Sequence, residues 1–103
     1  MVIGATAKHV KLIVFNACYS DEEAVRMLQH VDAVIGMTDS ISDDAAMAFA
    51  AQLYSSIGFG LDLATAFNQA VAAVIIISPA EADIPNLRTR DGLHAKDIVF
   101  VEG

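Results

Sequence analysis

The sequence predicts a single α/β domain, residues 1–103, in which helices cover both faces of a short, mostly parallel sheet of about three strands. The length suits one domain. Apolar residues make up 55% of the chain and aromatic residues only 7%, a composition typical of α/β proteins with buried strands. Strand-like and helix-like stretches follow in the order strand, helix, strand, helix, helix, strand, which indicates a three-layer α-β-α arrangement.

Two strands and one helix are predicted in the first part of the chain. Residues 10–15 are nearly all apolar and include Val, Ile and Phe, which favours a buried strand. Ser20 and Glu23 have the spacing of a capping box, so a helix is expected over residues 22–29. The stretch "VDAVIGM", residues 31–37, predicts the second strand. The helix side chains expected to face the sheet are Ala24, Val25 and Leu28.

Two further helices are predicted in the middle of the chain. Ser42, followed by two acidic residues, is a strong helix start. The helix over residues 45–57 is apolar around most of its circumference, so it should be largely buried. The stretch Gly58-Phe59-Gly60 ends this helix, and Asp62 begins the next helix, which is expected over residues 63–73.

The last part of the chain gives weaker signals. The apolar stretch over residues 70–78 leaves a helix and a strand open, because short apolar runs do not distinguish them by period alone. Pro79 and Pro85 bracket what is expected to be an acidic loop. Residues 97–101, "DIVFV", predict a closing strand.

Composition and charge restrict the classes of partner. The formal net charge is −7 and no basic run occurs, so the chain lacks the cationic surface that binds nucleic acid or an anionic membrane. A single cysteine allows neither an internal disulfide nor a Cys-based zinc cage, and it fits a reducing, cytoplasmic setting. No Gly-x-Gly-x-x-Gly motif follows the first strand, and no cofactor or metal is expected. The high apolar content favours a surface buried against a partner, with loose core packing as the alternative.

Cys18 is the candidate for chemistry. It ends the first predicted strand, and chemistry in open α/β sheets gathers outside the carboxyl ends of strands. The helix expected after Ser20 points its amino end toward the thiol, which favours a thiolate and a nucleophilic role. The alternative is a small apolar side chain that packs at the strand end. The residues alone favour this alternative, since a reactive cysteine needs a base.

The three histidines are poorly placed to be that base. His9 lies at the other end of the same strand, roughly 25–30 Å from Cys18. His30 ends the helix that returns along the sheet, so it lies at the same wrong end. His94 precedes the last predicted strand and reaches the Cys18 side only if that strand runs antiparallel. We therefore interpret all three as exposed surface residues.

Several short motifs occur in a specific order. They are Asn16-Ala17-Cys18, Val34-Ile35-Gly36, Asp43-Asp44-Ala45-Ala46, Leu53-Tyr54, and Gly60 followed by the helix at 64–70. In this order and spacing, residues 10–90 resemble the CHAT domain, a bacterial caspase-like peptidase module. The resemblance implies a partial caspase-like fold with Cys18 at the nucleophile position.

The chain also departs from the family pattern. Ser20 stands where a glycine is frequent, and Thr38-Asp39-Ser40-Ile41 stands where a tryptophan is usual. Family members carry the catalytic histidine on the preceding strand, in a Gly-His-Gly-like motif, and the chain begins too close to the cysteine strand to include it. We therefore expect the C-terminal portion of such a domain, without its general base and with an exposed edge on the first strand.

Two functions are consistent with this resemblance. The favoured one is a protein without peptidase activity by itself that acts as a dimerising protein-interaction module. It would form a homodimer through the exposed sheet edge or the apolar helices and bind a protein or peptide. The alternative is a subunit of a split cysteine endopeptidase, with Cys18 as nucleophile and a histidine from a partner chain. Acidic residues near Cys18 would then favour a basic P1 side chain, although helix capping is their more ordinary role. These residues are Asp21, Asp39, Asp43 and Asp44.

Overall fold

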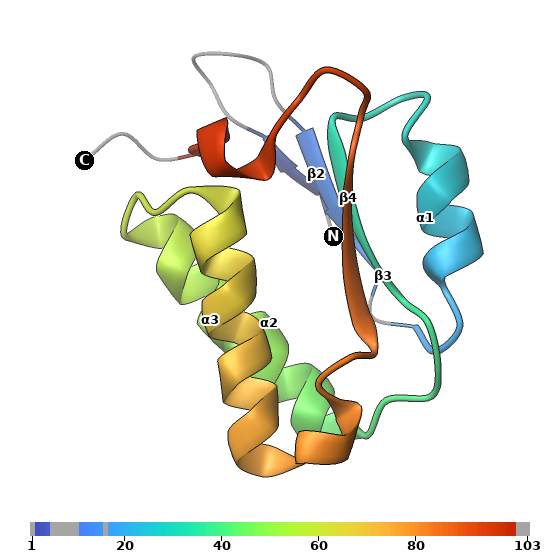
Figure 1. Cartoon of the computed structure of the whole chain (residues 1–103), viewed down its shortest axis with the longest axis vertical. Coiled ribbons are helices and arrows are strands. Elements are labelled where there is room, and N and C mark those ends of the chain that lie inside the picture. Colours follow the sequence, from blue (N-terminus) through green and yellow to red (C-terminus); the bar gives the residue numbers. More distant parts are fainter. Residues whose placement is uncertain (1, 5–10, 16, 101–103) are drawn as a thin grey trace.

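The middle layer of the fold is a four-stranded mixed sheet (Figure 1). The computed structural model describes residues 2–4, 11–15 and 17–100. β2 and β3 run parallel, whereas β1 is antiparallel to β2 and β4 is antiparallel to β3. The predicted α/β class is confirmed, but the sheet is mixed rather than mostly parallel. The strands, in their order across the sheet, are β1 (Val2–Gly4), β2 (Lys11–Val14), β3 (Ala33–Met37) and β4 (Pro85–Thr89).

Helices cover both faces of the sheet, so the predicted α-β-α layering is confirmed. α1 (Asp21–Met27) lies on one face (Figure 1). α2 (Asp43–Gly58) and α3 (Leu63–Ile77) lie side by side on the other face. Two short 3-10 turns, η1 (Pro79–Glu81) and η2 (Ala95–Asp97), come before and after β4. Across the described residues, no helix combines the length and the apolar character needed to cross a membrane.

Side-chain alternation along the strands divides the core in two. Leu12 and Val14 of β2 belong to the larger cluster, which β2 and β3 form with α2 and α3. Ile13 packs in the smaller cluster under α1, together with the fully buried Ala24. Val25 was predicted to face the sheet as well, but this side chain is 45% exposed, because the short α1 presents only a narrow stripe to the strands.

The start signals predicted for α2 and α3 are confirmed. The Ser42 hydroxyl accepts a hydrogen bond from the Ala45 N–H, and the Asp62 carboxylate accepts one from the Thr65 N–H at 2.8 Å. Gly60 has a φ of 85°, the left-handed conformation that lets the chain leave α2 and turn back into α3. The two helices then pack closely, and the Phe49 and Phe67 rings meet edge to face with centroids 5.8 Å apart.

The ambiguous stretch after residue 70 is helical. Ala70 and Val74 are fully buried and continue the apolar stripe that Leu63 and Ala66 begin, so α3 extends to Ile77. The helix stops there because Pro79 cannot continue it.

The prediction of a closing strand at residues 97–101 is wrong for the residues that the structure describes. Asp97 is the last residue of η2, and Ile98 and Phe100 are buried against the larger core instead of pairing in the sheet. The Ile98 carbonyl accepts a hydrogen bond from the Leu63 N–H at 2.8 Å, which satisfies a free donor at the start of α3. Residue 101 lies outside the described residues.

The fourth strand instead lies at residues 85–89, directly after the predicted acidic loop, where no element was predicted. β4 pairs with β3 over five residues, from Pro85 opposite Met37 to Thr89 opposite Ala33. Its proline and polar residues are tolerated because β4 lies at the edge of the sheet. At the other edge, β1 pairs with β2, so the exposed edge predicted for the first strand is also wrong.

Gly36 permits close packing between α1 and the sheet. An added Cβ at this position would lie 2.8 Å from the Cα of Asp21 and 2.9 Å from the Cβ of Ala24. Both distances are shorter than ordinary van der Waals contact, and the nearer atom belongs to the backbone. The first turn of α1 therefore rests directly on β3, and any larger side chain at position 36 must displace it.

We predict that Gly36→Ala lowers the free energy of unfolding by about 1–3 kcal/mol, because the added methyl group overpacks the contact with α1. Gly58→Ala is the matched control, since an added Cβ at Gly58 meets no atom within 4 Å. The control should be neutral or stabilise the chain by up to about 1 kcal/mol. Urea denaturation measures both changes, and equal midpoints for Gly36→Ala and the wild type would contradict the close approach of α1.

Candidate functional site

Cys18 lies in the turn between β2 and α1, at the carboxyl end of β2. Its side chain is exposed, so it is not a buried apolar residue that fills the core. The sulfur faces the backbone of Ile41, whose N–H is 3.5 Å and whose carbonyl is 3.8 Å from Sγ. Ile41 belongs to the loop that follows β3. The thiol thus joins the loops at the ends of the two parallel strands.

A second contact between these loops comes from Tyr19. This residue has a φ of 57°, an uncommon conformation for a residue other than glycine. Its N–H donates to the Asp39 carbonyl at 3.4 Å. The pKa of the Asp39 carboxyl is lowered, first by the Ser40 N–H and then by a hydrogen bond from the Tyr19 side chain. Tyr19 therefore holds the turn of Cys18 against residues 38–41.

Ser20 has a role that differs from the predicted capping box. Its hydroxyl is buried and accepts a hydrogen bond from the Met37 N–H at 3.0 Å, so it makes no side-chain cap on α1. Its φ is −88°, which any residue adopts, and the left-handed position falls on Tyr19 instead. Serine is therefore compatible with the backbone at this position. The hydroxyl fixes the start of α1 to the end of β3.

The four acidic residues near Cys18 do not form one pocket. Asp21 binds Arg88 through two hydrogen bonds, at 2.9 and 3.2 Å, and it also accepts a bond from Asn86. The pKa of Asp21 is lowered, chiefly by the hydrogen bond from Arg88. Asp43 and Asp44 lie in the first turn of α2, as helix capping predicts. The charge of Asp21 is thus already neutralised within the chain.

An open hollow lies beside the Cys18 turn. Its volume is about 310 Å³. Met37 and Thr38 at the end of β3 and Tyr19 of the turn form part of its wall, and Asp21 and Glu22 of α1 complete it. The hollow lies at the carboxyl end of the parallel strands, where α/β proteins bind ligands.

The described histidines lie at the opposite end of the sheet. His30 is exposed and follows α1, just before β3 begins. His94 is exposed in the loop after β4, and this loop is tied to the start of β3 because the Arg90 N–H donates to the Asp32 carbonyl. The length of β3, about 13–16 Å at roughly 3.3 Å per residue, separates them from the Cys18 end. His9 lies outside the described residues.

The loop after β3 is anchored by a residue that sequence reasoning missed. Glu81 in η1 accepts the Ser42 N–H at 2.6 Å through one carboxylate oxygen and the Ser42 hydroxyl at 2.8 Å through the other. These bonds lower the pKa of Glu81, with the backbone N–H of Ser42 contributing most. Glu81 thus fixes the residue that follows Ile41. The sequence showed it only as one acidic residue in a loop between two prolines.

No protein-family model matches the chain, and no curated protein is significantly similar to it. Within the described residues, no group of three or more His, Cys, Asp or Glu side chains could hold a metal ion.

We predict that Glu81→Gln lowers stability at neutral pH, and that its difference from the wild type narrows as the pH falls. The folded-state pKa of Glu81 lies below that of the unfolded chain. Its contribution is therefore complete above the ordinary carboxyl pKa of about 4.3 and is lost as the pH falls through the lowered folded value. Urea denaturation over a pH series measures the difference.

Asp83→Asn provides the control for this experiment, because it removes the same charge from an exposed residue two positions away. A stability difference between Glu81→Gln and the wild type that stays constant down to acidic pH would show that the Glu81 carboxylate does not anchor the loop.

Proposed function

We propose that this chain is a caspase-like module of the CHAT type that does not cleave peptides by itself and acts as a dimerising protein-interaction module. One observation carries the first part: the Cys18 thiol is exposed at the carboxyl end of β2, while the described histidines lie at the other end of β3. The motif resemblance supports the choice of family, and the confirmed α/β class is compatible with it.

The chemistry of a cysteine peptidase requires a base beside the thiol. The base removes the thiol proton and later protonates the leaving amine, so a nucleophile without it loses most of its catalytic power. The nearest partner of Cys18 Sγ in the described residues is the Ile41 backbone, which has no group that can take up this proton. The seven-residue α1 is also a short source of helix dipole for stabilising a thiolate.

A split cysteine endopeptidase is the alternative function. The exposure of Cys18 and the adjacent hollow of about 310 Å³ favour it, because a partner chain could bring a histidine to the thiol. Substrate charge is less defined than the sequence predicted, since Asp21 is paired with Arg88. Asp39 and the two acidic residues at the start of α2 remain the candidates for attracting a basic P1 side chain.

The interaction role rests on the surface and composition of the chain. Several large apolar side chains are strongly exposed, among them Met47, Phe59 and Ile76, and exposed apolar side chains that cluster on one surface favour association with another protein. A net charge of −7 disfavours nucleic acid and anionic membranes as partners. The free, exposed thiol of Cys18 suits a reducing, cytoplasmic compartment.

We predict that Cys18 reacts with iodoacetamide at neutral pH no faster than the same thiol in the urea-unfolded chain, because no base activates it. A peptide with a basic P1 residue should be cleaved no faster by the wild type than by Cys18→Ser. Mass spectrometry follows the alkylation, and a fluorogenic peptide follows cleavage. A native rate about tenfold above that of the unfolded chain, or cleavage lost in Cys18→Ser, would favour the peptidase function instead.

We predict that the purified chain is a dimer, with a mass near twice the 10.9 kDa of one copy. Light scattering after size exclusion, over a range of concentrations, measures this mass directly. A mass of one copy at every concentration would remove dimerisation from the proposed function while leaving the result for Cys18 untouched.

A further inference from the structure

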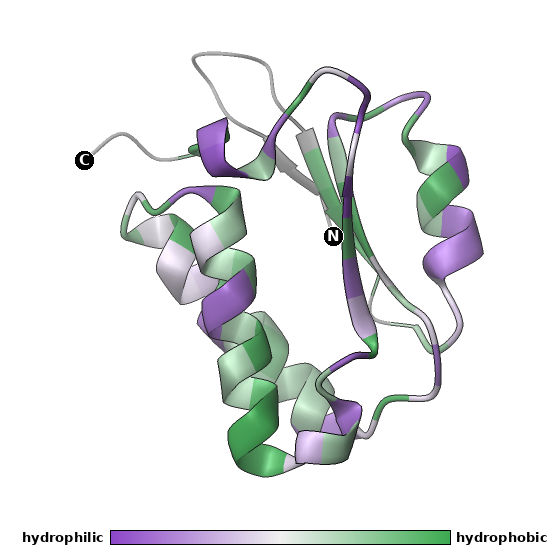
Figure 2. Ribbon diagram, in the orientation of Figure 1, coloured by the Kyte–Doolittle hydropathy of each residue, from purple (hydrophilic) through white to green (hydrophobic). Residues whose placement is uncertain are grey.

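The C-terminal half of α3 exposes an unusual amount of apolar surface. Ile76 is 84% exposed, and its neighbours Ile75 and Ile77 are 48% and 52% exposed. Figure 2 shows this end of α3 as the most hydrophobic part of the helix. The inward side of the same segment is already buried through Val74. The exposed parts of these isoleucines therefore lie outside the core, and removing them from water would favour association with another protein.

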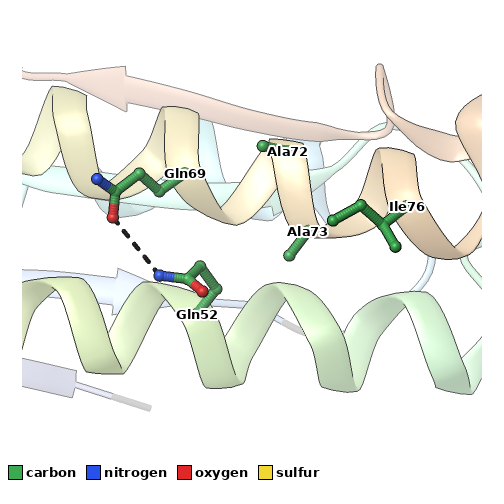
Figure 3. Close-up of a pocket in the computed structure, with 5 residues that line it drawn as sticks. All are labelled: Gln52, Gln69, Ala72, Ala73 and Ile76. Atoms are coloured by element: carbon green, nitrogen blue, oxygen red, sulfur yellow. Dashed lines mark hydrogen bonds between the residues drawn. The ribbon is translucent and has the colours of Figure 1, made fainter.

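A shallow hollow lies beside Ile76, between α2 and α3 (Figure 3). Its volume is about 300 Å³, and Ala72 and Ala73 of α3 line it. At one end, Gln52 of α2 donates a hydrogen bond to Gln69 of α3 at 3.5 Å, and Ile76 stands at the other end. One face of the molecule thus carries both a protruding apolar side chain and a hollow with small side chains.

Charge is absent from this pair of helices over nearly their whole length. From Ala45 to Ala80 the only charged residue is Asp62, which caps the start of α3. That end of α3 lies away from Ile76, which is near its C-terminus. The acidic residues that produce the net charge of −7 are therefore concentrated elsewhere. Asp43 and Asp44, in the first turn of α2, and Glu81, which is bonded to Ser42 just after α3, lie at the end of this face near Ile76. The centre of the face, around Ala72 and Ala73, carries no charge, so two acidic copies can approach each other there.

We propose that this face binds a second copy of the chain, with Ile76 of each copy packed against the Ala72–Ala73 hollow of the other. A two-fold axis requires a surface that is complementary to itself. An antiparallel crossing of the two α3 helices near Ala72 and Ala73 meets this requirement, because small residues at the centre allow close approach while Ile76 lies to each side. The inference rests on the proposed dimerisation and names the surface that carries it.

The sheet edges are less suited to this contact. β1 is only three residues long, and a short edge strand offers few backbone groups for pairing. β4 begins with Pro85, which has no N–H, and carries Arg88. Proline and charged residues are the features by which edge strands avoid pairing with other chains. The centre of the α2–α3 face, which carries neither charge nor proline, has no such protection.

The test compares the dimer dissociation constants of the wild type and two variants. Ile76→Lys removes the protruding side chain, and Ala72→Lys fills the hollow. Each should raise the dissociation constant by at least about tenfold, the effect of a residue at the centre of an interface. Both substitutions make the chain less acidic, so weaker association cannot come from greater overall repulsion. Sedimentation over a concentration series gives the constants.

Val25→Lys is the matched control, since Val25 is an exposed apolar residue of α1 on the other side of the sheet. It should leave the dissociation constant within about threefold of the wild type, and circular dichroism should show that all variants are folded. Higher salt should strengthen the wild-type dimer by screening the repulsion between two acidic copies.

The outcomes separate this inference from the proposed function. A wild-type dimer that both α3 variants leave unchanged would overturn the α2–α3 face while the dimerising function stands. A wild type that stays monomeric would overturn both. Equal weakening by Val25→Lys would show a contact through α1 and also overturn the inference.

Discussion

Parallel pairing of β2 with β3 is the interaction on which the candidate site depends. The register sets Val14 opposite Ile35, and the Phe15 N–H continues the pairing by donating to the Ile35 carbonyl. Both strands therefore end side by side, and the turn with Cys18 must leave the sheet next to the loop with Ile41. Parallel strands cannot be joined by a tight turn, so α1 has to cross between them. Gly36 lets that helix lie directly on β3. Placement of Cys18 thus follows from the topology.

The parts of the fold with a strong local signal could be predicted from the sequence. Continuous apolar runs identified β2 and β3, because strands that are covered on both faces contain few polar residues. Ser42 and Asp62 marked the starts of α2 and α3, since a side-chain oxygen at these positions satisfies a free N–H. The hydrophobic periodicity of the sequence did not show where α3 ends. The helix continues to Ile77 because Ala70 and Val74 are buried against the core.

The incorrect predictions have a common physical cause. Edge strands and contacts between segments distant in the chain leave little recognisable pattern in the local sequence. β4 is an edge strand. Its Asn86 and Arg88 donate hydrogen bonds to Asp21 of α1, so its sequence is polar and does not resemble a buried strand. Ile98 and Phe100 are apolar because they cover the core near the start of α3, and in the sequence this alternation looks like a strand. At the site, Cys18 was identified from its position at a strand end. The hydrogen bonds that Met37 donates to Ser20 and Ser42 donates to Glu81 connect residues 17 and 39 positions apart, and no local pattern reveals them.

α2 connects the two surfaces to which function is assigned. Its cap, Ser42, follows the residue that contacts the Cys18 thiol and is held by Glu81 from η1. Further along the same helix, Gln52 lines the hollow shared with α3. A second copy bound to that face would restrain α2, and with it the anchor of the loop beside Cys18, since a helix of this length moves as a rigid unit. In the alternative peptidase function, the same connection would let association order the nucleophile loop. The proposed dimer face and the loop beside Cys18 therefore belong to one packed unit, even though their residues do not touch.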